Sequence, residues 1–96
     1  EQHHRAGLQY HPLRDETFHL LSGEVLVYFV DAAGVLRKTE MHPGESFHVP
    51  RGAIHSVQTL TDSVMLEVSC GPVPSGDAIN VESDYNIDKA MPWSSS

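Results

Sequence analysis

Glu24-Val25-Leu26-Val27-Tyr28-Phe29-Val30 is the stretch that decides the fold class. It is rich in the β-branched and aromatic residues that strands favour. The turn-type sequence Asp31–Gly34 follows it, and residues 35–40 form a second strand-like stretch, so we predict a β-hairpin. Because residues 24–30 are apolar at nearly every position, both faces of this strand should be covered, one by the core and one by a second sheet or a second subunit. We therefore expect a homodimer.

The rest of the chain continues the pattern of short strands separated by turns. Residues 54–59 and 64–69 are strand-like and are joined by the tight connection Leu60–Ser63, while no stretch of helical periodicity exceeds two turns. Short strands at close intervals predict an all-β fold, a small antiparallel β-barrel. Because the composition changes after the last of these strands, we predict a barrel domain over residues 1–70 and a partly irregular C-terminal extension over residues 71–96.

The bulk composition excludes several classes of protein. The chain has 96 residues, which suits one domain, and its formal net charge of -7 opposes binding to the phosphates of nucleic acids. No apolar run approaches the roughly 18–20 residues that span a bilayer, so we expect no membrane partner. Cys70 is the only cysteine, which rules out an internal disulfide framework and agrees with the cytoplasmic location that we expect.

Two spaced patterns of residues predict a metal site. The first is His11-x4-Glu16-x6-Gly23, and the second is Gly44-x5-Pro50-x-Gly52-x2-His55. Because strand and turn sequences separate the polar residues, His11, Glu16 and His55 can converge on one ion. Two imidazoles and a carboxylate suit Zn, Mn, Fe, Ni or Co and leave coordination positions open for a substrate. Gln9 shares a strand face with His11 and could add its amide oxygen as a fourth ligand. The glycines should have purely structural roles at turns, with Gly23 at a positive φ.

These two patterns resemble the two motifs of the cupin superfamily, small β-barrels that hold a metal ion in the barrel mouth. In the first cupin motif, Gly-x5-His-x-His-x(3,4)-Glu-x6-Gly, this chain has Gln9 at the position of the first histidine and His3 at the position of the first glycine. In the second motif, Gly-x5-Pro-x-Gly-x2-His-x3-Asn, Thr59 replaces the asparagine. The resemblance covers about residues 7–69 and implies a jelly-roll-like double-stranded β-helix. Cupin barrels usually have one or two strands before the first motif, so sequence upstream of Glu1 or a neighbouring subunit would supply the missing edge.

The tail of the chain is similar to the tail of the cupin in type II phosphomannose isomerases. Asp77, Glu82 and Tyr85 fall in register with that family, whereas its two arginines correspond to Asn80 and Ile87. The loss of both cations argues against a phosphorylated sugar, because arginine is the natural bidentate partner of phosphate. Isomerases of unphosphorylated sugars, such as D-lyxose isomerases, remain similar enough to consider.

The function that this resemblance favours is metal-dependent isomerisation of a sugar-like hydroxy-carbonyl compound, in which a base moves a proton between carbons. The candidates for the base are Glu45, His48 and Glu67. One alternative is a non-haem iron dioxygenase, since two histidines and one carboxylate form the facial triad of such enzymes. Another is a non-catalytic sugar-binding or sensing domain. The residues leave the choice among these three open, together with the identity of the metal.

Overall fold

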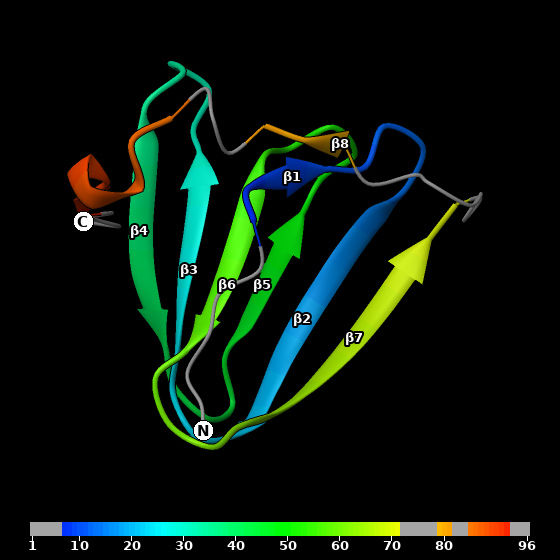
Figure 1. The fold of residues 1–96 in the computed structure, drawn as a ribbon. Coiled ribbons are helices and arrows are strands. Elements are labelled where there is room, and N and C mark those ends of the chain that lie inside the picture. The colour runs from blue at the N-terminus through cyan, green and yellow to red at the C-terminus, as the bar shows by residue number, and fades with distance from the viewer. Residues whose placement is uncertain (1–6, 72–78, 82–84, 93–96) are drawn as a thin grey trace.

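Two β-sheets that face each other make up the protein (Figure 1). The computed structural model describes residues 7–71, 79–81 and 85–92. The strands are β1 (Gln9–Tyr10), β2 (Asp15–Ser22), β3 (Val25–Val30), β4 (Leu36–Met41), β5 (Ser46–Val49), β6 (His55–Thr59), β7 (Val64–Cys70), β8 (Ile79–Asn80) and β9 (Met91–Pro92). The 3-10 turn η2 (Ile87–Lys89) is the one helical element of the described residues. The predicted all-β class is therefore confirmed.

The order of the strands is that of a jelly roll. One sheet has the order β8-β1-β6-β3-β4-β9, and the other has the order β5-β2-β7. The chain consequently passes from one sheet to the other at most of its connections, as jelly rolls do. Neighbouring strands are antiparallel except for β4 and β9, which are parallel.

The predicted hairpin is present as β3 and β4, which pair from Val25↔Met41 to Val30↔Leu36. Its turn is held by Asp31, whose Oδ1 accepts hydrogen bonds from the backbone N–H groups of Ala33 at 3.0 Å and of Val35 at 2.9 Å. Residues 60–63 connect β6 to β7, where the sequence predicted a tight connection. Turn chemistry is a local property, and for that reason both connections could be predicted from the sequence.

An apolar cluster packs in part of the space between the sheets. Leu20, Val25, Val27 and Met41 are buried there, and half-buried residues such as Phe29 pack against them. On β2 every second side chain is buried, namely Glu16, Phe18 and Leu20. This period of two directs Glu16 into the same interior as the apolar core.

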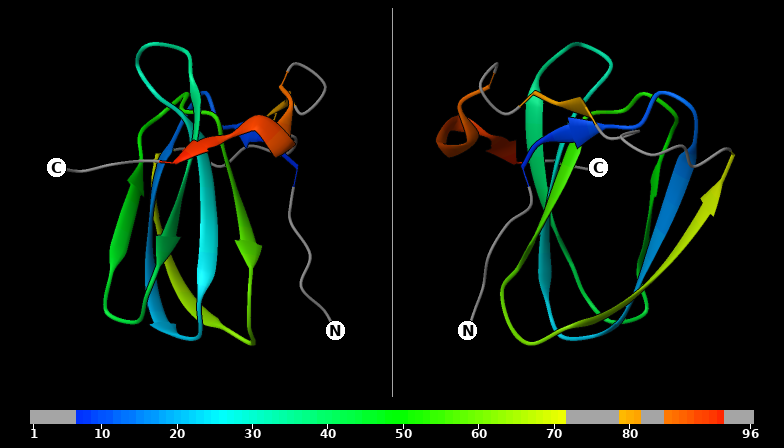
Figure 2. Two further views of the ribbon diagram at one scale, coloured as in Figure 1. Left: turned by 90° about the vertical axis from the view of Figure 1, so that its left-hand side faces the viewer. Right: turned by 45° about the vertical axis from the view of Figure 1, so that its right-hand side comes forward.

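The outer face of β3 is covered by the protein's own C-terminal segment. Tyr28 is buried there with Leu8, Leu36 and Ala90, and half-buried apolar residues of the tail such as Ile87 pack against them. Figure 2 shows this segment crossing the outer side of β3 and β4. The expectation that both faces of this strand are covered is confirmed, but the expected cover by a second sheet or a second subunit is wrong, because a later part of the same chain provides it.

The homodimer therefore stays a prediction without its original argument. Exposed apolar side chains do occur elsewhere, on β7, which carries Val64, Leu66 and Val68 at an edge of the three-stranded sheet. The proposed domain boundary at residue 70 also stays a prediction, and the described parts of the tail add β8 and β9 to the six-stranded sheet. None of the described residues forms a helix that is long and apolar enough to cross a membrane.

Candidate metal centre

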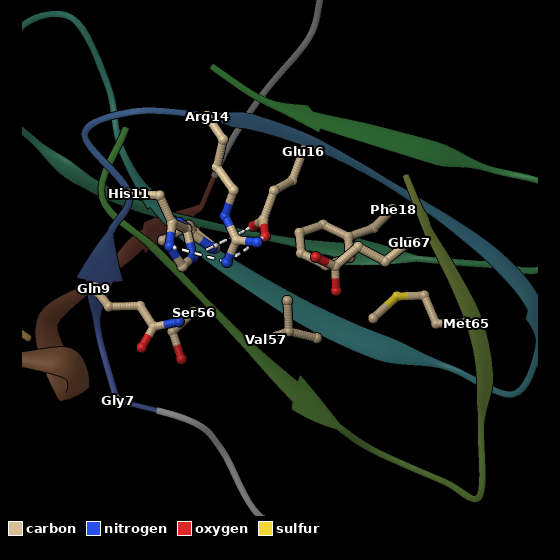
Figure 3. Close-up of a pocket in the computed structure, with 11 residues that line it drawn as sticks. Gly7, Gln9, His11, Arg14, Glu16, Phe18, Ser56, Val57, Met65 and Glu67 are labelled. Atoms are coloured by element: carbon tan, nitrogen blue, oxygen red, sulfur yellow. Dashed lines mark hydrogen bonds and ion pairs between the residues drawn. The ribbon is translucent and has the colours of Figure 1, made fainter. Parts of the chain in front are cut away.

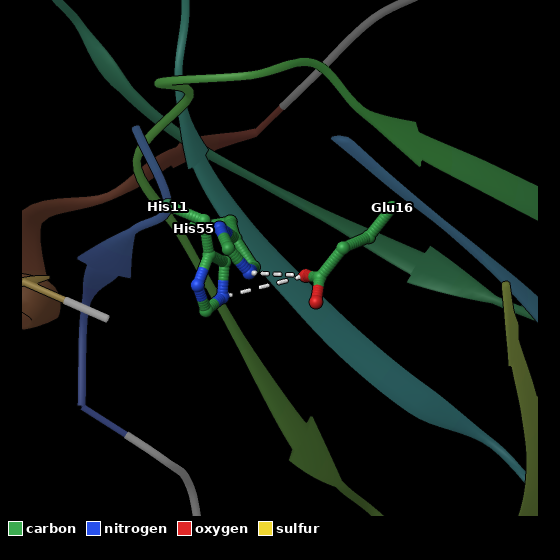
Figure 4. Close-up of side chains that lie close together, drawn as sticks. All are labelled: His11, Glu16 and His55. Carbon is green, nitrogen blue, oxygen red and sulfur yellow. Dashed lines mark ion pairs between the residues drawn. The ribbon is translucent and has the colours of Figure 1, made fainter. Parts of the chain in front are cut away.

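Three segments bring His11, Glu16 and His55 together between the two sheets (Figure 4). His11 follows β1, Glu16 lies on β2, and His55 begins β6. All three are buried, with exposed fractions of 6%, 4% and 4%. One potential ligand atom from each lies within 4.8 Å of the others, and Oε1 of Glu16 is 3.5 Å from Nε2 of both histidines. We call this group the ligand trio.

The turn at residues 50–53 explains how the two histidines meet although they are far apart in sequence. The backbone N–H of Ala53 donates to the carbonyl of Pro50 at 3.0 Å, which closes the turn, and the N–H of Gly52 donates to the carbonyl of His11 at 2.9 Å. Gly52 has a φ of 82°, a conformation that residues other than glycine rarely adopt. The turn thus fixes the loop before β6 against His11, and the two imidazole rings lie 5.6 Å apart.

The protonation of His55 suits a cation. Nδ1 of this ring is 3.1 Å from the carbonyl oxygen of Ala53, which can only accept, so Nδ1 carries the proton and Nε2 presents a lone pair to Glu16. Burial lowers the pKa of His55 and favours this neutral form, although the Ala53 carbonyl acts in the opposite direction. Two hydrogen-bond acceptors therefore face each other in a buried site, at 3.5 Å. Two ligands about 2.1 Å from one tetrahedral metal ion are separated by about 3.4 Å, so the residues fit a bound ion.

A pocket of about 270 Å³ opens beside the ligand trio (Figure 3). It is lined by Gly7, Gln9, His11, Arg14, Glu16, Phe18, His55, Ser56, Val57, Met65 and Glu67. Gln9 is thus in the same pocket as the trio, and β1 places it directly opposite His55 in the sheet. Its role as a fourth ligand stays a prediction.

Comparison with known proteins agrees with this geometry. Residues 1–70 match the family model of the cupin domain. The chain belongs to the cupin family. Its similarity to germin-like protein subfamily 1 member 1 of Arabidopsis thaliana is 43% identity over 60 residues, which covers 62% of this chain and 28% of the relative.

Solved structures of larger proteins share the fold of this cupin. A variant of Bacillus subtilis oxalate decarboxylase superposes with a TM-score of 0.68 at 22% identity, covering 80% of this chain and 21% of that one. An oxalate oxidase superposes with a TM-score of 0.59 at 27% identity, covering 68% of this chain and 34% of the other. The cupin resemblance is confirmed, and this cupin spans only a fraction of each of these proteins. Their names point to oxalate chemistry and germin-like proteins, not to the sugar isomerases that the tail pattern favours.

The candidates for a catalytic base are placed differently by the fold. Glu67 lines the pocket, where Ser69 donates a hydrogen bond to its Oε2 at 3.2 Å. His48 is 56% exposed, with Nε2 3.2 Å from Oδ2 of Asp15, and does not line this pocket. Glu45 is also exposed and accepts a hydrogen bond from the backbone N–H of His42 at 2.7 Å in the turn before β5. Of the three, only Glu67 is positioned beside the ligand trio of this cupin.

The tail residues that suggested sugar isomerases are only partly described. Asp77 and Glu82 lie outside the described residues, as does His3 of the first motif. Tyr85 packs against the apolar cluster on the outer face of β3, away from the pocket lining. None of the residues that line the pocket comes from the described part of the tail, although Asn80 pairs with Gln9, which does line it.

Arg14 is the residue of the site that sequence analysis missed. Its side chain is 16% exposed and lines the pocket, with Nη2 3.4 Å from Oε2 of Glu16 and 3.3 Å from Nδ1 of His11. The signal was available, because a cation stands between the two predicted ligands in the short loop that joins them. Arginine has only hydrogen-bond donors and does not ligate metals, so a pattern of imidazole and carboxylate ligands does not indicate a role for it.

Proposed function

We propose that this cupin domain binds a divalent transition-metal ion through His11, Glu16 and His55, and that the bound ion receives a small carboxylic acid. The observation that carries the proposal is the buried contact in which Nε2 of His55 and Oε1 of Glu16 face each other at 3.5 Å as two acceptors. A cation resolves this arrangement, and histidine with carboxylate is the donor set of first-row transition metals. Gln9, in the same pocket, is the candidate for a further ligand.

Several features support a small carboxylate as the compound that binds. Arg14 brings a positive charge to the pocket, and guanidinium groups pair with carboxylates through charge-assisted hydrogen bonds. The volume of about 270 Å³ suits a molecule of a few heavy atoms. Two structures of similar fold are an oxalate decarboxylase and an oxalate oxidase by name. When bound, the metal supplies Lewis-acid polarisation of a substrate oxygen, and Arg14 and the walls of the pocket orient the acid.

Metal content tests the first part of this proposal. The parent protein and two variants, His55→Ala and His48→Ala, should be loaded in turn with Mn, Fe, Co, Ni and Zn, desalted and measured by elemental analysis. We expect near-stoichiometric metal in the parent and in His48→Ala, because His48 is exposed and outside the pocket, and almost none in His55→Ala. A parent protein that retains none of the five metals would refute the site and favour the non-catalytic binding domain.

Isomerisation of a hydroxy-carbonyl sugar is a second candidate function, and the position of Glu67 supports it. This carboxylate lines the pocket but does not belong to the ligand trio. A base that transfers a proton between carbons is needed at such a position, beside the metal ligands. The metal-loaded protein should be titrated calorimetrically with oxalate and separately with an aldopentose. A heat of binding that is observed with oxalate but not with the aldopentose supports the carboxylate proposal. Heat with the sugar, together with isomer formation that Glu67→Gln abolishes and Glu45→Gln leaves intact, supports the second candidate.

A further inference from the structure

We propose that the guanidinium of Arg14 neutralises the ligand trio in place of the metal ion. It must leave His11 before a metal can bind there. This inference rests on the proposed metal site and concerns how that site is controlled. It predicts that the protein holds metal more weakly than its ligand trio alone would allow.

The contacts of Arg14 place its charge among the proposed ligands. One terminal nitrogen, Nη2, reaches both Nδ1 of His11 at 3.3 Å and Oε2 of Glu16 at 3.4 Å. Figure 3 shows the guanidinium directed at these two side chains from the loop before β2. Arg14 thus contacts two of the three members of the trio.

The proton on His11 is the first reason why this arrangement and a metal exclude each other. A guanidinium has only donors, so Nδ1 of His11 must accept its hydrogen bond, and the neutral ring then carries its proton on Nε2. A metal binds an imidazole nitrogen that has no proton. Binding at Nε2 moves the proton to Nδ1, where it would face the donor Nη2, and binding at Nδ1 takes the place of Arg14 itself. In both cases Arg14 has to leave His11.

His55 shows the opposite arrangement. Its Nδ1 donates to the carbonyl of Ala53, so its Nε2 already presents a lone pair to Glu16. One imidazole of the trio is therefore prepared for a metal by the backbone, and the other is held by Arg14 in the tautomer that a metal at Nε2 cannot use.

Charge gives the second reason. Glu16 is 4% exposed, and a buried carboxylate needs a positive partner to offset its lost hydration. Arg14 is such a partner at 3.4 Å, and a divalent ion among the same ligands would be another. Two cations so close to each other repel, so metal binding is an exchange of one positive charge for another. The need to displace Arg14 lowers the affinity for metal. The contact of Arg14 with Glu16 stabilises the protein when no metal is bound.

Variants at Arg14 test the inference by affinity and not by activity. Arg14→Gln removes the charge, Arg14→Lys keeps it, and Arg51→Gln is the matched control, because Arg51 is exposed in the turn before His55 and its loss changes the net charge equally. Zinc dissociation constants should be measured by competition with a chromophoric chelator. We expect Arg14→Gln to bind zinc at least about tenfold more tightly than the parent. Arg14→Lys should stay closer to the parent than Arg14→Gln, and Arg51→Gln should stay within about twofold of it.

Two further measurements complete the test: the melting temperature of the metal-free proteins and the position of the ring proton of His11. Metal-free Arg14→Gln should melt below the parent. In the metal-free parent, imidazole ¹⁵N shifts should show the proton of His11 on Nε2 and that of His55 on Nδ1, a measurement that needs no variant to fold. Zinc binding that is equal in the parent and Arg14→Gln, or a His11 proton on Nδ1, would overturn the role of Arg14 while leaving the metal site intact. Failure of the parent and of every variant to bind zinc or any other of the five metals would instead remove the proposed function and this inference with it.

Discussion

Replacing Gly23 with alanine should destabilise this cupin much more than the same change at Gly44. Both glycines have positive φ angles, 87° and 93°, so an alanine at either site costs about 1–2 kcal/mol of backbone energy. At Gly44 an added Cβ meets nothing within 4 Å. At Gly23 it would overlap the carbonyl oxygen of Asp62 and the hydroxyl of Ser63 and would lie 2.7 Å from Cα of Ser63.

The overlap at Gly23 adds a second cost, because backbone atoms have to move. Forcing extra atoms into a packed region typically costs about 1–3 kcal/mol, so the total loss is about 2–5 kcal/mol for Gly23→Ala and about 1–2 kcal/mol for Gly44→Ala. Urea unfolding followed by circular dichroism measures both losses against the parent. Equal losses, or a larger loss at Gly44, would refute the reasoning that close approach of the connection between β6 and β7 requires a glycine at position 23.

Three further predictions concern the core, the hairpin and the metal. Leu20→Ala should cost about 2–5 kcal/mol in urea unfolding, because Leu20 is fully buried between the sheets, and Leu21→Ala, exposed on the same strand, should cost less than about 0.5 kcal/mol. The Arg37 side chain, with the backbone N–H groups of Val35 and Ala33, lowers the pKa of Asp31 below its ordinary 3.8, so its stabilising effect is present above that pH and is lost as the pH falls through the lower folded value. Asp31→Asn should therefore melt below the parent at pH 7, and the gap should close below pH 3.8; a gap that is constant with pH would contradict this. Zinc at one hundred times its dissociation constant should stabilise the parent by about 2.7 kcal/mol, EDTA should reverse this, and His55→Ala should show neither effect.

The sequence predicted those parts of the molecule whose causes are local. The hairpin of β3 and β4 follows from the turn at Asp31, whose side chain holds the backbone of Val35 four residues later. The direction of Glu16 follows from the alternation along β2. Even the long-range meeting of His11 and His55 has a short-range cause, because the turn that ends at Gly52 also bonds to the backbone of His11. The spacing Pro50-x-Gly52-x2-His55 is the sequence pattern that indicates this turn.

The cover of the outer face of β3 could not be predicted in the same way. An apolar strand indicates that both faces are buried, but it contains no information about what buries them. In this protein Ile87 and Ala90 do so from about sixty residues away, and only the packing of the whole chain decides between such a segment and a second subunit. The argument for a dimer failed at this step, although its premise was right.

Arg14 shows why the ligand trio could be predicted while the chemistry of the site could not. Metal ions select their ligands by donor type, so two histidines and a carboxylate at motif spacing are enough to predict a candidate metal site. The chemistry of such a site depends on the other side chains of the pocket, which belong to no motif. In our proposals Arg14 would favour an anionic compound, and Glu67 would offer a base for a neutral one. A cupin barrel fixes the first question and leaves the second to a few variable positions. We therefore propose that Arg14 and Glu67, and not the fold that holds them, decide whether this pocket prefers oxalate or an aldopentose.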